Sequence, residues 1–529
     1  MRLLYNTKYS IINSHMSDSN VGGRRNMSCI NHIFIINGII HETCSSKKNK
    51  PVIIQIYDYK QMFDSMDLYE AVSDMFNSGV NDDSLALLYN ANTEIKVRVK
   101  TPSGLSVEQQ FPKLVLQGDT WAPIMASNQV DTFGKQLIEE EPSFLYRYKG
   151  IVPVGVLGMI DDLAGISEGS MKAKELNAFI NVKSAEKKLQ FGANKCNTLT
   201  IYNKNVINEE TDLLIDYWSE KHDKEDHLIE AFEGKIKMKK GSEQKYLGYI
   251  ISDDGSNMKN ILAKEKRAHG VKREIQYLIQ GLGKFTFESS MIYINSLLRS
   301  TTLFAAETMY NISEKDYRQI ERIDEDMMRR VVKTGRGFAS YQLYLELGQL
   351  PARYVIKRMK VILFHYILTQ KEETLMLKFL MAQKNCPTKG DWNSEVSDIL
   401  EEFEINITIE ELKNIPANRF KRIVKLKSEI AGFNYLKCQQ QKCGKGSRIR
   451  YESLELQDYL NPFSNISIEN QRLLFSLRCE MNILKSTFRR NPNINSRYCI
   501  NSCKNEIDNK HLVYCPELNR NSEVQYEYI

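Results

Sequence analysis

The hydrophobic pattern of the first half alternates between strand-like and helix-like stretches. The run "VIIQIYD" (52–58) is continuously apolar and β-branched, which is typical of a strand buried on both faces, and it ends at Asp58. From Met66 the period becomes helical, and Gly79 fits the end of that helix. One face of this predicted helix carries Leu68, Val72, Met75 and Phe76.

Hairpins are predicted where short apolar runs flank turn residues. "EIKVRVK" (94–100) alternates and is followed by the turn "TPSG" (101–104). The stretch "GVLGMIDDLAGIS" (155–167) predicts a strand, a tight turn and a second strand. A helix is expected over 169–190, and a strand or hairpin over 244–252. The remaining expectations here are a helix after the turn at "LQGDTWAP", a strand at 197–202 and an acidic, loop-like excursion at 208–232.

Beyond about residue 258 the pattern changes to long amphipathic helices, such as 314–334. Residues 386–395 and 439–447 are rich in polar and turn-forming residues, and we expect them to be linkers. The pattern therefore predicts an α+β first half followed by a helical second half.

Composition narrows the class of protein. The chain has 529 residues, is 42% hydrophobic and carries a net charge of +6, which permits a polyanionic partner without requiring one. The N-terminus lacks a secretory signal, and the longest apolar runs are about half a membrane span. We expect a soluble intracellular protein without a membrane partner, in the nucleus or the cytoplasm.

Three carboxylates have the order expected of a metal site. Asp58 ends the predicted buried strand, and Asp161 and Asp162 occupy the turn of the apolar hairpin. Such carboxylates can hold two Mg²⁺ ions about 3.5–4 Å apart, with open positions for substrate phosphates. A pair of aspartates at a turn is also common without any function, because Asp tolerates turn conformations.

The segments around these carboxylates resemble a known family. "YDYKQMFDSM", "LQGDTWAP", "GMIDDLAGIS", "GANKCNTLTI" and "KYLGYIIS" occur in the order of reverse-transcriptase motifs A to E, and they are similar to those of non-LTR retrotransposon polymerases. The resemblance implies a right-hand polymerase palm with partial fingers, an all-α thumb and connector, and a small Cys/His module. The implied segments are a fingers remnant (1–50), palm (51–255), helical thumb (256–385), helical connector (386–490) and tail (491–529).

The resemblance also implies a role for each matching residue. Asp58, Asp161 and Asp162 match the Mg²⁺ ligands, for which Mn²⁺ is an alternative metal. Phe63 matches the aromatic gate that excludes a ribonucleotide 2′-hydroxyl. Lys195 matches a proton donor to the leaving pyrophosphate. Gln117 and Gly118 match the two motif B residues that lie near the incoming nucleotide and the template in the family.

The C-terminal segment contains four residues with ligand-like spacing, namely Cys499, Cys503, His511 and Cys515. Three thiolates and one imidazole can close a tetrahedral structural Zn²⁺ site. Non-LTR elements also carry such a module after the thumb, so the resemblance supports this expectation. The alternative is four residues that share no ligand.

The implied activity is RNA-directed DNA polymerisation with an RNA template, a DNA primer and dNTPs. The basic fingers residues of the family would precede "SDSNVGGRRN", so we expect an N-terminally truncated copy. A catalytically inactive retroelement fragment and a co-opted nucleic-acid-binding protein are the main alternatives. An RNA polymerase of the same right-hand type is a third, although Phe63 argues against it. The sequence leaves the oligomeric state open.

Overall fold

The computed structural model describes residues 11–45, 50–80, 82–113, 115, 120–192, 194–202, 212–222, 228–281, 286–334, 339–443 and 449–479. The chain divides into two compact units. We call the first, Met1–Asn260 with Thr308–Asn311 and Tyr366–Ser397, the sheet unit. The second, Ile261–Glu307 with Ile312–His365 and Asp398–Ile529, is the helical unit.

The sheet unit is built on a five-stranded sheet in the order β13-β10-β1-β9-β8. Its central strand β1 (Val52–Asp58) pairs antiparallel with both β9 (Asp162–Glu168) and β10 (Asn197–Ile201). The edges are β8 (Val156–Met159), antiparallel to β9, and β13 (Lys239–Lys240), parallel to β10. The predicted buried strand ending at Asp58 and the predicted hairpin at 155–167 are both confirmed.

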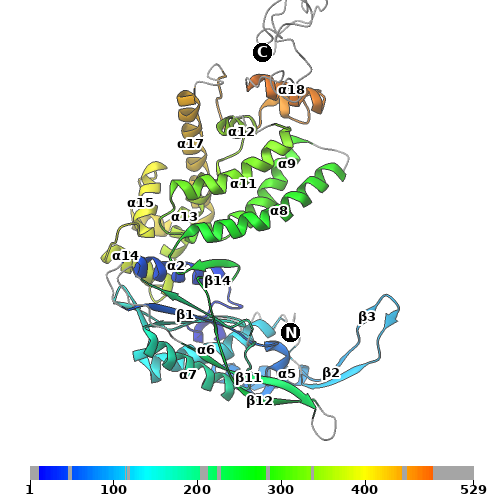
Figure 1. Ribbon diagram of the computed structural model, residues 1–529, viewed down its shortest axis with the longest axis vertical. Coiled ribbons are helices and arrows are strands. Elements are labelled where there is room, and N and C mark those ends of the chain that lie inside the picture. The colour runs from blue at the N-terminus through cyan, green and yellow to red at the C-terminus, as the bar shows by residue number, and fades with distance from the viewer. Residues whose placement is uncertain are drawn as a thin grey trace, which may run out of the picture. The chain divides into compact units, whose positions relative to one another are not determined.

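Helices cover both faces of this sheet, which explains why β1 is apolar along its length. Every residue of β1 is buried except Asp58, which is half-buried. In Figure 1, α6 (Ala122–Glu140) and α7 (Ser170–Glu186) lie on one side of β1, and α2 (Cys29–Ser45) lies on the other. The C-terminal end of β1, which carries Asp58, is thus the place where this buried strand becomes partly exposed.

The other elements of the sheet unit are mostly short. They are α3 (Met62–Ser65), α4 (Leu68–Asn77), α5 (Asp82–Ala91), β2 (Thr93–Val97), β3 (Lys100–Thr101), β4 (Gly104–Leu105), β5 (Gln109–Lys113), η1 (Pro142–Phe144), β6 (Tyr146–Tyr148), β7 (Val152–Val154), β11 (Leu214–His222), β12 (Leu228–Lys237), β14 (Glu243–Tyr246), β15 (Tyr249–Ser252) and α14 (Leu375–Asn385). The predicted hairpin at 94–104 is confirmed as β2–β5 with β3–β4 beyond it. On the predicted helix at 68–77, Leu68 and Met75 are buried, whereas Phe76 is exposed.

The loop predicted at 208–232 is wrong over its described residues. β11 and β12 form a long antiparallel hairpin, and Asn177 and Asn181 of α7 donate to the Leu214 carbonyl at 2.7 and 3.0 Å. Acidic composition was a misleading signal, because strand pairing satisfies backbone groups whatever the charge of the side chains.

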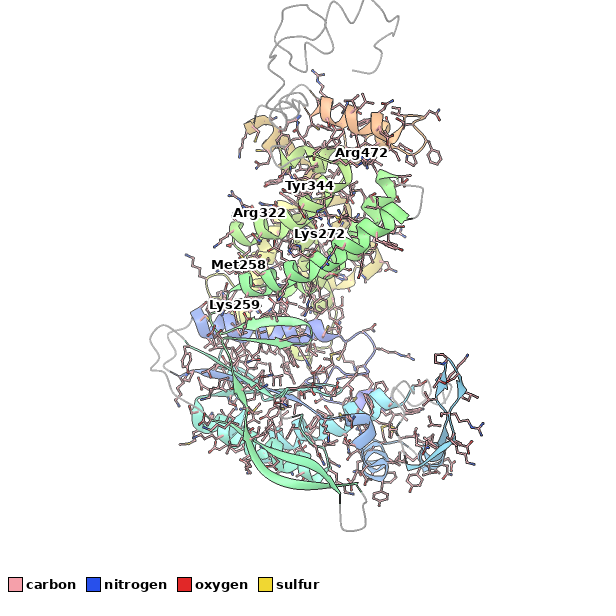
Figure 2. The ribbon with its side chains drawn as sticks, turned by 45° about the vertical axis from the view of Figure 1, so that its right-hand side comes forward. Met258, Lys259, Lys272, Arg322, Tyr344 and Arg472 are labelled. Carbon is pink, nitrogen blue, oxygen red and sulfur yellow. The ribbon has the colours of Figure 1, made fainter. Side chains whose placement is uncertain are left out.

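The helical unit contains the long helices expected from the sequence. The helices of this half of the chain are α8 (Asn257–Gly281), α9 (Phe287–Tyr293), the π-helical turn η2 (Ile294–Leu298), α10 (Arg299–Thr302), η3 (Ala306–Thr308), α11 (Glu314–Val332), α12 (Ser340–Glu346), α13 (Ala352–Leu368), α15 (Trp392–Glu402), α16 (Ile409–Asn414), α17 (Ala417–Cys443), η4 (Asp458–Leu460) and α18 (Ile468–Arg478). Figure 2 marks Lys272 on α8, Arg322 on α11 and Arg472 on α18.

Both predicted linkers are partly helical. α15 begins at Trp392, inside the predicted linker 386–395, because Trp392 is a fully buried core residue. α17 continues to Cys443, through the described part of the linker predicted at 439–447. The predicted boundaries of the fingers remnant, palm, thumb, connector and tail stay predictions. In space, residues 308–311 and 366–397 group with the sheet unit.

The mixed α+β architecture predicted from the sequence is confirmed, with one small main sheet and many helices. Within the described part of the chain, no helix combines the length and apolar character needed to cross a bilayer.

Candidate active site

The pairing of β1 with β9 brings two predicted ligands together. Asp58, the last residue of β1, lies directly opposite Asp162, the first residue of β9. Directly opposed residues on neighbouring strands have Cβ atoms about 4.5–5.5 Å apart and point to the same face. Asp161 precedes Asp162 in the turn between β8 and β9. We call Asp58, Asp161 and Asp162 the carboxylate cluster.

The turn that carries Asp161 has an unusual backbone. Met159 pairs with Asp162, so Ile160 and Asp161 alone make the turn of the hairpin. Ile160 has φ 59°, in the left-handed region that β-branched residues rarely adopt. This conformation costs free energy and persists only where surrounding contacts enforce it.

Burial and repulsion act together on Asp162. Burial, followed by the charges of Asp161 and Asp58, raises the pKa of this carboxyl to about 6, and Lys195 and Lys245 oppose the shift. The ionised cluster is therefore an unfavourable arrangement that an added cation would relieve.

Lys195 supplies part of that positive charge. Its Nζ lies 2.9 Å from Asp58 Oδ1, and the hydrogen bond and charge of Asp58 raise the pKa of the ammonium. The backbone fixes this position, because Gly192 N–H donates to the Asp58 carbonyl at 2.8 Å and Lys195 N–H to the Gly192 carbonyl at 2.8 Å. The predicted proton donor is thus brought to the predicted metal ligand.

A segment near the N-terminus supports the hairpin. Val21 N–H donates to the Gly158 carbonyl at 3.0 Å, and Gly158 N–H donates to the Ser19 carbonyl at 2.9 Å. Gly22 packs directly beneath the turn, where a Cβ atom would lie 2.5 Å from Ile160 N and 2.2 Å from Ser127 Oγ. Only glycine leaves room for this approach.

His32 is a residue of this region that sequence reasoning missed. It is fully buried in α2, and burial lowers its pKa to about 3, so the imidazole is neutral. Its Nε2 lies 3.1 Å from the Ser19 carbonyl, which can only accept, and so Nδ1 accepts from the Tyr246 hydroxyl at 3.1 Å. The signal available in the sequence was a polar ring within the apolar run "HIFIINGII".

Tyr246 extends this contact to the carboxylate cluster. It ends β14 just before the turn at Leu247 and Gly248, which both have positive φ. Burial raises the pKa of its hydroxyl, and the next contribution is the charge of Asp162. His32 therefore connects the β14–β15 hairpin to the segment that supports β8.

The remaining predicted site residues divide into two groups. Phe63 lies in α3, half-buried against the main core of the sheet unit, and its role as a gate stays a prediction. Gln117 and Gly118 lie outside the described residues, as do the four predicted zinc ligands Cys499, Cys503, His511 and Cys515.

The carboxylate cluster suits Mg²⁺ in its chemistry. All its donors are carboxylate oxygens, which this cation prefers, and their mutual repulsion would be reduced on binding. Across the described residues, no three His, Cys, Asp or Glu side chains are grouped so that they could hold a metal ion, and this includes the carboxylate cluster as it stands. The two Mg²⁺ ions stay a prediction, and the Lys195 ammonium would compete with a cation for Asp58 Oδ1.

Comparison with known proteins gives distant likenesses. Neither a protein-family model nor a curated protein sequence matches the chain. Similar solved structures include telomerase from Candida albicans in complex with a TWJ fragment of telomeric RNA, at 12% identity and a TM-score of 0.31, over 75% of this chain and 57% of that one. Apo telomerase from Candida tropicalis matches at 11% identity and a TM-score of 0.32, over 80% of this chain and 60% of that one.

The chain therefore spans about three fifths of the length of the telomerase chains it matches.

The raised pKa of Asp162 predicts how stability depends on pH. The folded state holds this proton up to about pH 6, whereas the unfolded chain releases it near 3.8, so stability falls as pH rises through that window. We expect Asp162→Asn to raise the free energy of unfolding by about 1–2 kcal/mol at pH 8, with little effect at pH 4. Urea unfolding at both pH values measures this.

Asp212→Asn is the matched control, for which the expected change in stability has the opposite sign. Lys237 and Lys240 lower the pKa of Asp212 to about 2, so removing this charge lowers stability at pH 8. A stability gain at pH 8 in both variants would contradict the repulsion within the carboxylate cluster.

Gly22→Ala tests the support beneath the hairpin turn. The new methyl group would overlap the backbone at Ile160, so we expect a loss of about 1–3 kcal/mol in the free energy of unfolding. Gly134→Ala in α6 is the control, because its Cβ would meet only the ends of two serine side chains, Ser19 Oγ at 3.4 Å and Ser17 Oγ at 4.0 Å. Equal stability of the two variants would show that the turn does not depend on Gly22.

Proposed function

We propose that the chain is an RNA-directed DNA polymerase that adds deoxynucleotides to a primer 3′-hydroxyl. The observation that supports this most directly is the register of β1 and β9, which sets Asp58 opposite Asp162 next to Asp161. A carboxylate cluster at a half-exposed sheet edge is the arrangement that two-metal nucleotidyl transfer requires. The motif order around these residues gives the polymerase class.

In this proposal, Asp58, Asp161 and Asp162 would hold two Mg²⁺ ions. When bound, the ions supply activation of the primer hydroxyl and neutralisation of the departing pyrophosphate. The protein contributes position, because antiparallel pairing fixes Asp58 and Asp162 and the contacts of Gly22 and Ile160 fix the turn. The raised pKa of Asp162 also means that the cluster gains most from a cation above pH 6.

Lys195 and Phe63 have separate roles in the proposal. Lys195 is protonated at neutral pH, as lysines ordinarily are, and its hydrogen bond to Asp58 raises its pKa further. It would donate this proton to the leaving group. Phe63, half-buried in α3 five residues after Asp58, would exclude a ribonucleotide by contact with its 2′-hydroxyl.

We further infer a non-LTR retroelement origin, with RNA template, DNA primer and dNTPs as partners. The sheet unit would act as the palm, and the long helices after β15 as thumb and connector. A structural Zn²⁺ site at Cys499, Cys503, His511 and Cys515 belongs to the same proposal. It is supported by ligand spacing and motif resemblance.

Primer extension on an RNA template with Mg²⁺ and dNTPs tests the activity. We expect DNA product from the wild-type chain and a loss of at least about a thousandfold in Asp161→Ala/Asp162→Ala. Lys195→Ala is expected to slow extension about a hundredfold. Lys188→Ala is its matched control, since Lys188 has the same 68% side-chain exposure and pairs with Asp67 at 2.8 Å, away from the cluster.

Wild-type chain that binds the template–primer but makes no DNA would refute the polymerase and favour a nucleic-acid-binding protein. Product that survives the double substitution would refute the site. As an independent readout, millimolar Mg²⁺ should raise the unfolding temperature of the wild type and not of the double variant.

A further inference from the structure

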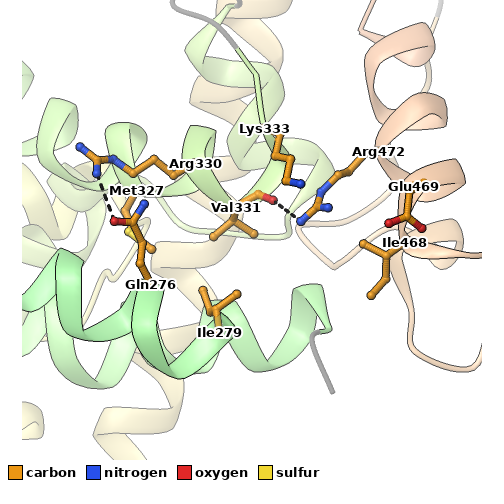
Figure 3. Close-up of a pocket in the computed structure, with 9 residues that line it drawn as sticks. All are labelled: Gln276, Ile279, Met327, Arg330, Val331, Lys333, Ile468, Glu469 and Arg472. Carbon is orange, nitrogen blue, oxygen red and sulfur yellow. Dashed lines mark hydrogen bonds between the residues drawn. The ribbon is translucent and has the colours of Figure 1, made fainter. Parts of the chain in front are cut away.

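The helical unit contains a pocket of about 310 Å³ where α8, α11 and α18 meet (Figure 3). Its floor is apolar and comes from all three helices, through Ile279, Met327, Val331 and Ile468. Its volume is at the lower end of the range for small-ligand sites. The pocket is thus large enough for one compact group and too small for a duplex.

Cations dominate the mouth of this pocket. Arg330, Lys333 and Arg472 line it together with one carboxylate, that of Glu469. In Figure 3, the Lys333 and Arg472 side chains point toward one another. No carboxylate among the described residues lies within ion-pair distance of the Lys333 ammonium. Two converging cations over an apolar floor favour a ligand with both an anionic group and a flat apolar part.

The backbone holds these cations in place. Lys333 is the left-handed C-cap of α11, with φ 57°, so the helix end sets the direction in which its exposed side chain leaves the backbone. Arg472 Nη2 donates to the Val331 carbonyl at 3.3 Å, which anchors α18 to α11. Burial lowers the pKa of the Arg472 guanidinium, and the charge of Glu469 opposes part of this shift, as a bound anion would.

A neighbouring cavity between α8 and α11 provides a contrast. It measures about 500 Å³ and is also lined with charge, but most of its cations pair with carboxylates. Lys272 lies 2.8 Å from Asp326, and Arg329 lies 3.4 Å from Glu325. These cations are already paired, and so is Arg330, which lines both cavities and lies 3.1 Å from Asp326. The pocket at α18 differs in Lys333, which has no carboxylate partner among the described residues.

We propose that the α18 pocket binds one unpaired nucleotide of a single-stranded nucleic acid. The phosphate lies between Lys333 and Arg472, and the base lies on the apolar floor. Base faces bind apolar and guanidinium surfaces, and phosphate contacts give affinity without sequence preference. The choice of a nucleotide over another anion with an apolar part rests on the proposed function.

Fluorescence anisotropy with a labelled oligothymidylate of about twelve nucleotides, at fixed salt, tests the phosphate contact. We expect Lys333→Glu and Arg472→Glu in the full chain each to weaken binding about tenfold. Arg322→Glu is the matched control, an exposed arginine of α11 in the neighbouring cavity, and should change binding less than about twofold. Equal losses in all three variants would overturn the pocket in favour of diffuse attraction.

A second set of binding measurements tests the contact between the base and the apolar floor. An abasic oligomer of the same length should bind the wild type about tenfold more weakly. In Ile468→Ser this difference should shrink, because part of the floor is lost. If abasic and normal oligomers bind the wild type equally, the pocket does not hold a base. Competition by poly-glutamate as strong as by unlabelled oligomer would instead identify an acidic-peptide site.

Two controls keep the outcomes separate. Circular dichroism and the unfolding temperature check that each variant folds, and Lys333→Met and Arg472→Met replace any glutamate variant that does not. Asp161→Ala/Asp162→Ala should bind the oligomer like the wild type. If the wild type binds the oligomer through the pocket but does not extend a primer, the pocket is supported and the polymerase is refuted. If the wild type extends a primer and the pocket variants bind the oligomer as well as the wild type, the polymerase is supported and the pocket is refuted.

Discussion

The antiparallel pairing of β1 with β9 is the constraint on which the candidate active site depends. This ladder runs from Val52 opposite Glu168 to Asp58 opposite Asp162. A slip of one residue would turn the side chains of one strand to the other face of the sheet, which would separate the two carboxylates and disrupt the packing against the helices on both faces. The buried residues of β1 therefore select the register, and the register in turn selects which charges meet.

Bringing these charges together is unfavourable in free energy, and contacts in the surrounding structure compensate for it. Asp162 is pushed toward its protonated form by burial and by its two neighbours, and Lys195 offsets part of this. The left-handed Ile160 adds backbone strain at the same turn. Contacts from Gly22 and from the strand-like segment before it enforce that turn. Strain and charge repulsion that gather at one half-exposed place, here the end of β1, are typical of a functional site, where a bound ligand compensates for them.

Buried polar contacts join the pieces around this edge. His32 accepts from Tyr246 and donates to the Ser19 carbonyl, so one neutral ring connects α2, the β14–β15 hairpin and the support of β8. Such a ring is costly to bury unless both nitrogens are satisfied, and here both are. In the helical unit, by contrast, most cations of the α8–α11 cavity pair with neighbouring carboxylates, whereas Lys333 has no such partner within the described residues. That difference singles out the pocket at α18.

Elements whose pattern is local could be predicted from the sequence. The strand ending at Asp58, the hairpin turn at Asp161 and the helix expected over 314–334, found as α11, follow from short apolar periods, and the order of motifs suggested the polymerase class. It missed the β11–β12 hairpin and the start of α15 at Trp392, because strand pairing and core burial depend on distant partners. Only the tertiary structure set Lys195 on Asp58, Gly22 beneath Ile160 and His32 against Tyr246. Each pair joins residues more than a hundred positions apart, and periodicity reports which face of an element is buried but not what it meets there.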